Sequence, residues 1–135
     1  MVPLDIQKLI DTAVSARDMS YSPYSGFKVG AALLSKGGII YKGCNIENAA
    51  HTPSICAERT AFAKAVSKGE KEFSAIAVAG WGSEQGFAFP CGVCRQVMME
   101  FCEPLTFTII VTDGSEYKKY TLAELLPEGF GPKSL

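Results

Sequence analysis

Hydrophobic residues near the start of the chain recur with the period of an α-helix. They fall at positions i, i+3, i+4, i+7 and i+8 of one stripe, formed by Ile6, Leu9, Ile10, Ala13 and Val14. We expect a helix that begins near Pro3 and ends at the turn-forming segment 22–26, Ser-Pro-Tyr-Ser-Gly. The apolar face of this helix would cover one side of a sheet.

Two later segments show the same helical period. Residues 55–68 carry an apolar stripe and are followed by the stop signal Gly69; the stripe is Ala61, Phe62, Ala65 and Val66. Residues 90–102 carry a second stripe, which we interpret as core: Val93, Val97, Met98 and Phe101. A last short helix is predicted at 122–126, where Pro127 ends it.

The segments between these helices read as strands. Residues 28–46 form two short β-runs around Lys36-Gly37-Gly38, which is typical of a hairpin because glycine adopts positive φ without a steric cost. Further strands are predicted at 73–80 and 105–112, with a weaker one at 116–121. This alternation of strands and helices indicates one α/β domain over residues 1–135, built as a three-layer α/β/α sandwich around about five strands. The pattern does not give the strand order.

Charge and length exclude several classes of protein. The 135 residues include 13 basic and 14 acidic ones, with a net charge of −1 and no run of like charges, so nucleic acid is an unfavourable partner. The N-terminal segment has acidic residues within its apolar pattern, and no stretch is apolar for the ~18 residues of a membrane span. We therefore expect a soluble cytoplasmic protein, in which the 5 cysteines stay reduced for metal binding or packing.

Three of the cysteines have the placement of metal ligands. Cys91 and Cys94 form a C-x-x-C pair after Pro90, at the expected start of a helix, and Cys56 lies near the start of another. Helix N-termini favour the thiolate form, which binds metals. Three thiolates around zinc would leave a coordination position for water, as in catalytic sites. A C-x-x-C pair by itself is also compatible with a redox pair or half of a structural zinc site.

Glu58 and Arg59 add chemistry to this cluster. Residues two apart in a helix interior point in different directions, but at the open helix end Cys56 and Glu58 can face one site. There the carboxylate would move protons as a general acid and base. Arg59 would offset the charge of three thiolates through hydrogen bonds to sulfur, although it is also compatible with a solvated helix charge.

Several separated motifs resemble those of the small zinc-dependent cytidine deaminases with three cysteine ligands. They occur in the family's order and spacing over nearly the whole chain: YSPYSGFKVGAALL, GCNIENAA, CAERTA, PCGVCRQVMMEF and ELLPEGFGP. The resemblance implies the family's sandwich with a mixed five-stranded sheet, a homotetramer, and one Zn²⁺ per subunit held by Cys56, Cys91 and Cys94. It implies that Glu58 shuttles protons while cytidine or deoxycytidine loses ammonia, in pyrimidine salvage.

The same resemblance implies a set of substrate contacts. Asn45 and Glu47 correspond to the residues that hydrogen-bond the ribose 3′-hydroxyl, and Phe27 to the aromatic residue that packs against the pyrimidine. The backbone N–H of Ala57 should meet the base carbonyl, and Phe130 should reach a neighbouring subunit's site. The expected partner is thus a small nucleoside, not a nucleic acid or a membrane.

Some residues depart from the family pattern or lack a role. Phe89 stands where the family usually has Ser or Thr before Pro-Cys-Gly, so its side chain could reshape the pocket. His51, the one histidine, is expected on the surface or beside the ligands, because a fourth ligand would close the catalytic position. Cys44 and Cys102 are expected to be small buried hydrophobic residues.

Three other functions remain as alternatives. A deaminase for another aminated base, such as that of blasticidin, resembles this chain around the cysteines, but the Asn-Ile-Glu motif at 45–47 favours a plain nucleoside. A non-catalytic, zinc-stabilised interaction domain would not need Glu58. A polynucleotide deaminase is disfavoured by the charge balance and by the lack of aromatic residues interleaved with basic ones.

Overall fold

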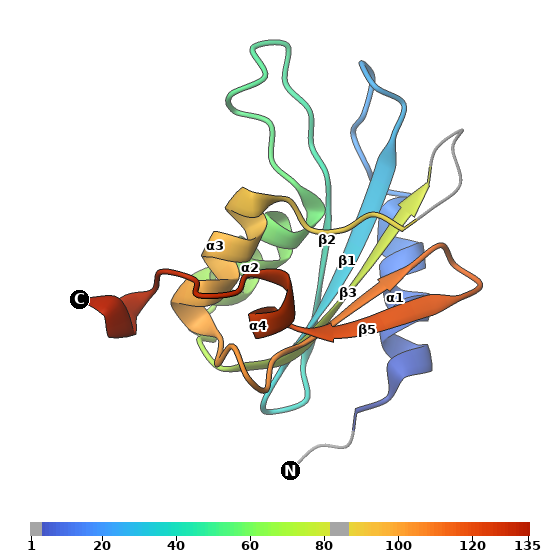
Figure 1. Ribbon diagram of the computed structural model, residues 1–135. Coiled ribbons are helices and arrows are strands. Elements are labelled where there is room, and N and C mark those ends of the chain that lie inside the picture. The colour runs from blue at the N-terminus through green and yellow to red at the C-terminus, as the bar shows by residue number, and fades with distance from the viewer. Residues whose placement is uncertain (1–3, 82–86) are drawn as a thin grey trace.

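The computed structural model describes residues 4–81 and 87–135 as an alternation of helices and strands (Figure 1). The elements are α1 (Ile6–Arg17), β1 (Lys28–Ser35), β2 (Ile40–Cys44), α2 (Ala57–Ser67), β3 (Phe73–Trp81), α3 (Gly92–Phe101), β4 (Thr108–Thr112), β5 (Tyr117–Thr121), α4 (Leu122–Leu125) and a 3₁₀ turn (Pro132–Ser134). Pro3, the expected helix start, lies outside the described residues, and α1 begins after the N-cap Asp5, whose carboxylate accepts the N–H of Lys8. Within the described ranges, every helix is too short or too polar to cross a membrane.

The five strands form one mixed sheet in the order β2-β1-β3-β4-β5. β3 and β4 are parallel, and the other neighbouring pairs are antiparallel. The predicted hairpin of β1 and β2 is confirmed, as is the mixed five-stranded sheet.

Helices cover both faces of the sheet, as the predicted three-layer architecture requires. Alternate residues of one strand point to opposite faces: Ala31 and Leu33 of β1 pack under α2 and α3, whereas Ala32 and Leu34 pack under α1. Figure 1 shows α1 on one side of the strands and α2 and α3 on the other. The larger core contains the aromatic rings, of which Phe62 and Phe107 are fully buried.

Two crossover connections bring the starts of α2 and α3 to the same place. β2 and β3 are both antiparallel to β1, so they run parallel to each other, with α2 between them in sequence; α3 connects the parallel strands β3 and β4. Such crossovers are almost always right-handed, and both move the chain the same way along the sheet, so both helices lie on one face. Their N-termini then meet at the carboxyl ends of β2 and β3, where α/β proteins bind ligands.

Gly43 on β2 lets α2 lie close to the sheet. A Cβ atom at this position would stand 2.4 Å from the carbonyl oxygen of Ala57 and 2.5 Å from the amide nitrogen of Ala61. Both atoms belong to the backbone of α2. Because Gly43 has no side chain, α2, which begins next to Cys56, can pack this close to the sheet.

Two predicted boundaries are wrong by a few residues for a physical reason. α2 starts at Ala57 and not at 55, because Ile55 pairs with Ile46 in an antiparallel bridge with both N···O distances at 2.9 Å, which holds it extended. The predicted strand at 105–112 is shortened to Thr108–Thr112, because the N–H of Phe107 turns back to the carbonyl of Glu103.

Candidate active site

The three predicted ligand cysteines meet at the adjoining starts of α2 and α3. Cys56 and Cys91 are the N-caps of the two helices, with extended backbone (ψ 157° and 169°), and Cys94 lies in the first turn of α3. Their sulfur atoms are 3.7 Å apart for Cys56 and Cys91 and 3.4 Å apart for Cys91 and Cys94, and all three lie within 4.8 Å of one another. The cap positions explain the convergence, because a capping side chain extends over the end of its helix.

The cysteine cluster fits zinc in both chemistry and spacing. Tetrahedral zinc with Zn–S bonds of about 2.3 Å places its sulfurs about 3.8 Å apart, close to the distances found. Cys94 is buried and Cys91 is exposed, so the cluster faces outward on one side. In the part of the chain that the structure describes, no other group of three His, Cys, Asp or Glu side chains comes together in this way. Three sulfur ligands leave the fourth tetrahedral position free.

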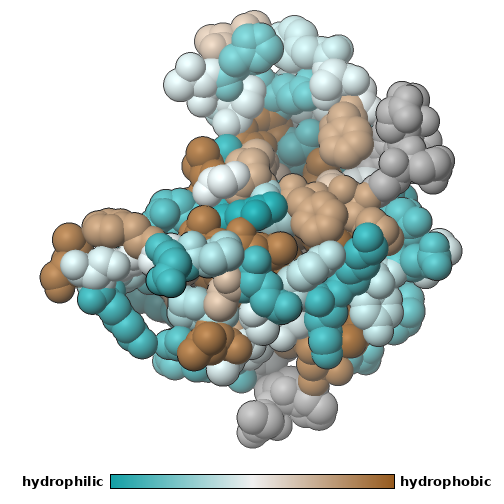
Figure 2. Space-filling model, viewed as in Figure 1, coloured by the Kyte–Doolittle hydropathy of each residue, from teal (hydrophilic) through white to brown (hydrophobic). Residues whose placement is uncertain are grey.

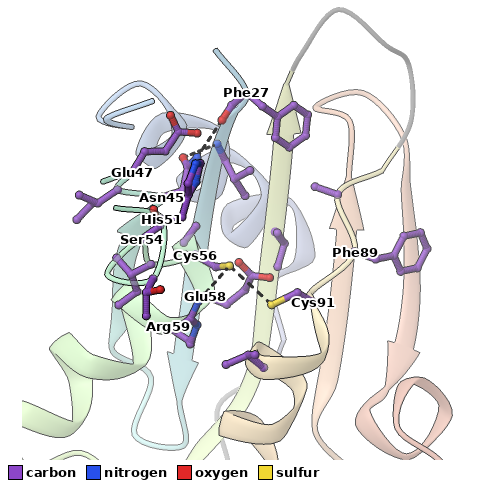
Figure 3. Close-up of a pocket in the computed structure, with 18 residues that line it drawn as sticks. Phe27, Asn45, Glu47, His51, Ser54, Cys56, Glu58, Arg59, Phe89 and Cys91 are labelled. Carbon is purple, nitrogen blue, oxygen red and sulfur yellow. Dashed lines mark hydrogen bonds between the residues drawn. The ribbon is translucent and has the colours of Figure 1, made fainter. Parts of the chain in front are cut away.

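Glu58 is a buried acid beside this cluster. Its side chain is 4% exposed, and burial raises its pKa to about 7. Because Cys56 is a cap and not a helical residue, the two side chains need not diverge around the helix axis. Figure 3 shows the carboxylate of Glu58 among the sulfurs of Cys56 and Cys91, so the structure brings the predicted acid and ligands together.

Arg59 contacts the same cluster. Its Nη2 donates to Cys56 Sγ at 3.5 Å, so the interpretation of Arg59 as a solvated helix charge is wrong. The pKa of Cys56 is lowered to about 5, chiefly by a hydrogen bond from Cys94 and further by Arg59. The guanidinium therefore stabilises sulfur in the thiolate form that a metal needs.

A cavity of about 620 Å³ opens over the cysteines and extends under the loop 45–56. This loop projects from the body of the molecule in Figures 1 and 2. The cavity wall combines polar groups from the loop with apolar side chains from the sheet, and it is formed by Phe27, Val29, Asn45, Ile46, Glu47, His51, Thr52, Ser54, Ile55, Cys56, Ala57, Glu58, Arg59, Val78, Ala88, Phe89, Cys91 and Val93.

Asn45 lies at the far end of this cavity from the sulfurs, where hydrogen bonds fix the orientation of its amide (Figure 3). Its Oδ1 accepts from Ser20 Oγ at 2.5 Å and from the N–H of Val29 at 2.9 Å, and its Nδ2 donates to the carbonyl of Phe27 at 2.9 Å. An amide nitrogen has two hydrogens. Among residues 4–81 and 87–135, the second N–H of Asn45 has no acceptor, so it is available to a ligand.

Glu47 is held by the segment that precedes β1. Its Oε1 accepts the N–H of Tyr24 at 2.9 Å and that of Ser25 at 3.2 Å, and its Oε2 accepts the Ser25 hydroxyl. The hydrogen bond from this hydroxyl is the main cause of a lowered pKa for Glu47, so the group is a carboxylate at neutral pH. Oε2 retains capacity for one more donor.

Phe27 and Ala57 line the cavity as expected. Phe130, which is expected to reach a neighbouring subunit's site, lies outside the cavity of its own chain. Phe27 is 41% exposed and borders the opening, while Ala57 is the first residue of α2, whose N–H has no acceptor within the helix. Phe130 is 60% exposed and lies in the C-terminal segment, where its carbonyl accepts from Gln96 at 2.8 Å. A contribution of its ring to a neighbouring subunit stays a prediction.

Phe89 borders the cavity without filling it. Its ring packs against Tyr120 of β5 with the centroids 5.6 Å apart, and Figure 3 shows it pointing away from the cysteines. The departure from the family pattern at this position therefore leaves the space above the sulfurs open.

His51, Cys44 and Cys102 are not part of the cysteine cluster. His51 lies on the cavity wall, so it is nearer the site than a plain surface residue. Its backbone has a φ of 62°. Cys102 is buried in the larger core, as predicted. Cys44 is only partly buried, because β2 is an edge strand, and its sulfur contacts the carbonyl oxygen of Met19 at 3.4 Å; the expectation of full burial was wrong.

Residues 4–109 match the family model of the cytidine and deoxycytidylate deaminase zinc-binding region. The chain belongs to this family. A cytidine deaminase of Sporosarcina psychrophila is 46% identical over 132 residues, which make up 98% of this chain and 96% of that relative. A cytidine deaminase of Halalkalibacterium halodurans is 45% identical over 127 residues, with coverage of 94% and 95%.

Solved structures of the family agree with the fold described above. The crystal structure of cytidine deaminase from Burkholderia pseudomallei is 42% identical, has a TM-score of 0.87, and the match covers 94% of this chain and 100% of that one. The crystal structure of cytidine deaminase from Mycobacterium tuberculosis is 32% identical with a TM-score of 0.82, covering 96% and 99%. The resemblance seen in the sequence motifs is confirmed, and the family's zinc fits the cysteine cluster.

Sequence reasoning missed the apolar wall of this deaminase cavity. Val29 and Val78 lie on neighbouring strands and face α2 and α3, while Ala88 lies in the segment that connects β3 to α3. The sequence predicted strands over 28–46 and 73–80, but it did not indicate that Val29 and Val78 would line one cavity. That information depends on the strand order.

Proposed function

We infer that the chain is a zinc-dependent deaminase that hydrolyses cytidine and deoxycytidine to uridine and deoxyuridine with release of ammonia. The observation that supports this function most strongly is the convergence of three cysteine sulfurs and a buried glutamate at one end of a cavity. A volume of about 620 Å³ is that of a small-molecule site. The 46% identity to a cytidine deaminase over nearly the whole chain supports this reaction. We assign the reaction to pyrimidine salvage.

Cys56, Cys91 and Cys94 would hold the zinc. When bound, the metal supplies Lewis acidity, which makes a water molecule an effective nucleophile at neutral pH. Three thiolates would weaken this effect by their charge, and Arg59 counters them through its hydrogen bond to Cys56. The guanidinium is thus part of the site's charge balance.

Glu58 would move the protons of the reaction. It would accept one proton from the attacking water and deliver it to N3 of cytosine. It would then take the second proton from the new C4 hydroxyl and pass it to the amine, so that the C4–N bond breaks, ammonia leaves and C4 becomes a carbonyl. Burial raises the pKa of this carboxyl to about 7, near the value at which one group can both take and give a proton at neutral pH.

The other end of the cavity would select a nucleoside over a free base. Asn45 has one N–H left to donate and Glu47 has one oxygen left to accept, and a hydroxyl group needs one acceptor and one donor. The ribose 3′-hydroxyl therefore completes the pair. Phe27 borders the same cavity for contact with the pyrimidine. The N–H of Ala57, which has no acceptor among the residues that the structure describes, suits the base carbonyl.

The assembly is proposed to be a homotetramer in the cytoplasm. Phe130 is 60% exposed, and Val93, which the sequence pattern assigned to the core, is 57% exposed, so that assignment is wrong for Val93. These exposed side chains support contact between subunits, and Phe130 would enter a neighbour's cavity. Five free cysteines, three of them a metal site, suit a reducing compartment. Sedimentation of the zinc-loaded protein measures the number of subunits.

Ammonia release from a panel of substrates tests the function. The purified protein is incubated with cytidine, deoxycytidine, cytosine, adenosine and blasticidin, with and without a zinc chelator. We expect ammonia from the two cytidines only, and its loss with the chelator. Turnover of blasticidin alone would assign the chain to antibiotic inactivation, and no turnover of any substrate would favour a non-catalytic zinc domain.

A further inference from the structure

The hydroxyl group of Ser25 links two residues at the ribose end of the cavity. It donates to Glu47 Oε2 and accepts the backbone N–H of Phe27 at 3.0 Å. With the two N–H groups of Tyr24 and Ser25, the segment 24–25 supplies every hydrogen bond that the described residues give to this carboxylate. The position of Glu47 is therefore set by this segment.

The two Glu47 oxygens are held differently. Oε1 is bound by two backbone N–H groups, which Ser25→Ala leaves in place. Oε2, the oxygen that can still accept a hydrogen bond from a ligand, accepts one only from the Ser25 hydroxyl among the described residues. Without that hydroxyl, the terminal torsion of Glu47 gains freedom, and a bound ligand would have to order it again at a cost in affinity.

We propose that Ser25 is a positioning residue, which aims Glu47 Oε2 at the ribose hydroxyl of the substrate. This inference rests on the proposed function, in which Glu47 accepts that hydroxyl. Phe27 keeps other restraints without Ser25, because its carbonyl accepts from Asn45 Nδ2 at 2.9 Å and its ring lies against Gly80. The role of Ser25 therefore concerns the ribose more than the pyrimidine.

The test compares Ser25→Ala with the wild type on two substrates that differ by one hydroxyl. With cytidine, we expect KM to rise about tenfold, the value of one hydrogen bond to a charged group, while kcat changes less than twofold. With 3′-deoxycytidine, which lacks the hydroxyl that Glu47 would accept, KM should change less than twofold on substitution. Ser25 is exposed, so its truncation does not threaten the core.

Two further variants serve as controls. Ser25→Thr keeps a hydroxyl and should return the cytidine KM to within about threefold of the wild type. Ser67→Ala removes a different side-chain hydrogen bond, from Ser67 Oγ to the carbonyl of Lys64 at 2.9 Å near the end of α2, and should leave both substrates unaffected.

The outcomes separate this inference from the function on which it rests. An equal rise in KM on both substrates in Ser25→Ala would mean a general structural role and overturn the proposal. A wild-type KM for cytidine in Ser25→Ala would also overturn it. So would a Ser25→Thr variant whose cytidine KM is as high as that of Ser25→Ala. If the wild type releases no ammonia from either nucleoside, the proposed function itself fails. If the wild type is active and Ser25→Ala has the same KM, only the role proposed for Ser25 is refuted, and the proposed function stands.

Discussion

Gly43→Ala should displace the helix that carries half of the active site. The added Cβ would lie 2.4 Å from the backbone oxygen of Ala57, and such contacts become ordinary only beyond 3.4 Å, so α2 must retreat from the sheet by about 1 Å. Cys56 and Glu58 would move with α2 while Cys91 stays with α3. A displacement of about 1 Å in a catalytic arrangement costs on the order of 100-fold in rate.

The same substitution should also destabilise the protein. Overpacking costs about 1–3 kcal/mol, which for a chain of this size lowers Tm by roughly 4 to 12 °C. Because a domain has about 5–15 kcal/mol of stability, most of the molecules should still be folded at 25 °C. The assay therefore measures kcat/KM on the folded protein, together with zinc retention against a chelator and thermal unfolding.

Two other glycines supply matched controls. Gly37→Ala makes the same chemical change where the nearest atom would be 3.7 Å away, so it should match the wild type. Gly30→Ala overpacks the opposite face, with its Cβ 2.1 Å from the carbonyl oxygen of Ala13 in α1, so it should lose stability but keep kcat within about threefold. Wild-type activity and zinc retention in Gly43→Ala would refute the reasoning, and an equal loss of kcat in Gly30→Ala would show that stability alone is responsible.

Three predictions concern the core and the supports of the site. Phe62→Ala should cost about 3–5 kcal/mol in urea unfolding, because the ring is 2% exposed and contacts three other aromatic rings; a loss below about 1 kcal/mol would contradict this. Burial raises the pKa of Cys102 from its ordinary value of 9.0, so the stability from this neutral thiol is complete below about pH 9 and falls as the pH rises, by up to about 1.4 kcal/mol per pH unit. Between pH 8 and 10 under reducing conditions, the free energy of unfolding of Cys102→Ala should fall less steeply with pH than that of the wild type. Identical slopes for the two proteins would argue against the burial effect. Arg95→Gln should cost about 1.5–3 kcal/mol and speed zinc loss to a chelator, because Arg95 donates to the carbonyls of Pro90 at 2.7 Å and Leu125 at 2.6 Å and so holds the turn before a ligand; unchanged zinc loss would show that this turn needs no such support.

The helices and strands could be predicted where the signal is local. The apolar stripe of α1 follows from the sequence alone, and Leu9, Ile10 and Ala13 are buried as it requires. The start of α2 could not be placed, because the bridge between Ile46 and Ile55 depends on a pairing across the loop. Strand order has the same limit, since it depends on contacts between strands that no local pattern records.

The chemistry of the site was more accessible to sequence than its shape. Thiols and a carboxylate at two helix starts are unusual enough to indicate a metal site, and the structure brings Cys56, Cys91 and Cys94 together. The contact of Arg59 with sulfur also follows from its place beside Cys56. The hydrogen bond from Ser25 to Glu47 joins segments 22 residues apart, so it is visible only in the fold.

Glu58→Gln tests most directly whether the cluster is a proton-moving catalyst and not a structural zinc site. The variant keeps the shape of the side chain but cannot take up or release the proton. Zinc content and cytidine turnover are measured on the same preparations of variant and wild type. We predict equal zinc in both and a fall in kcat of about 10²- to 10⁴-fold in the variant. Wild-type turnover in zinc-loaded Glu58→Gln would contradict the role assigned to this residue.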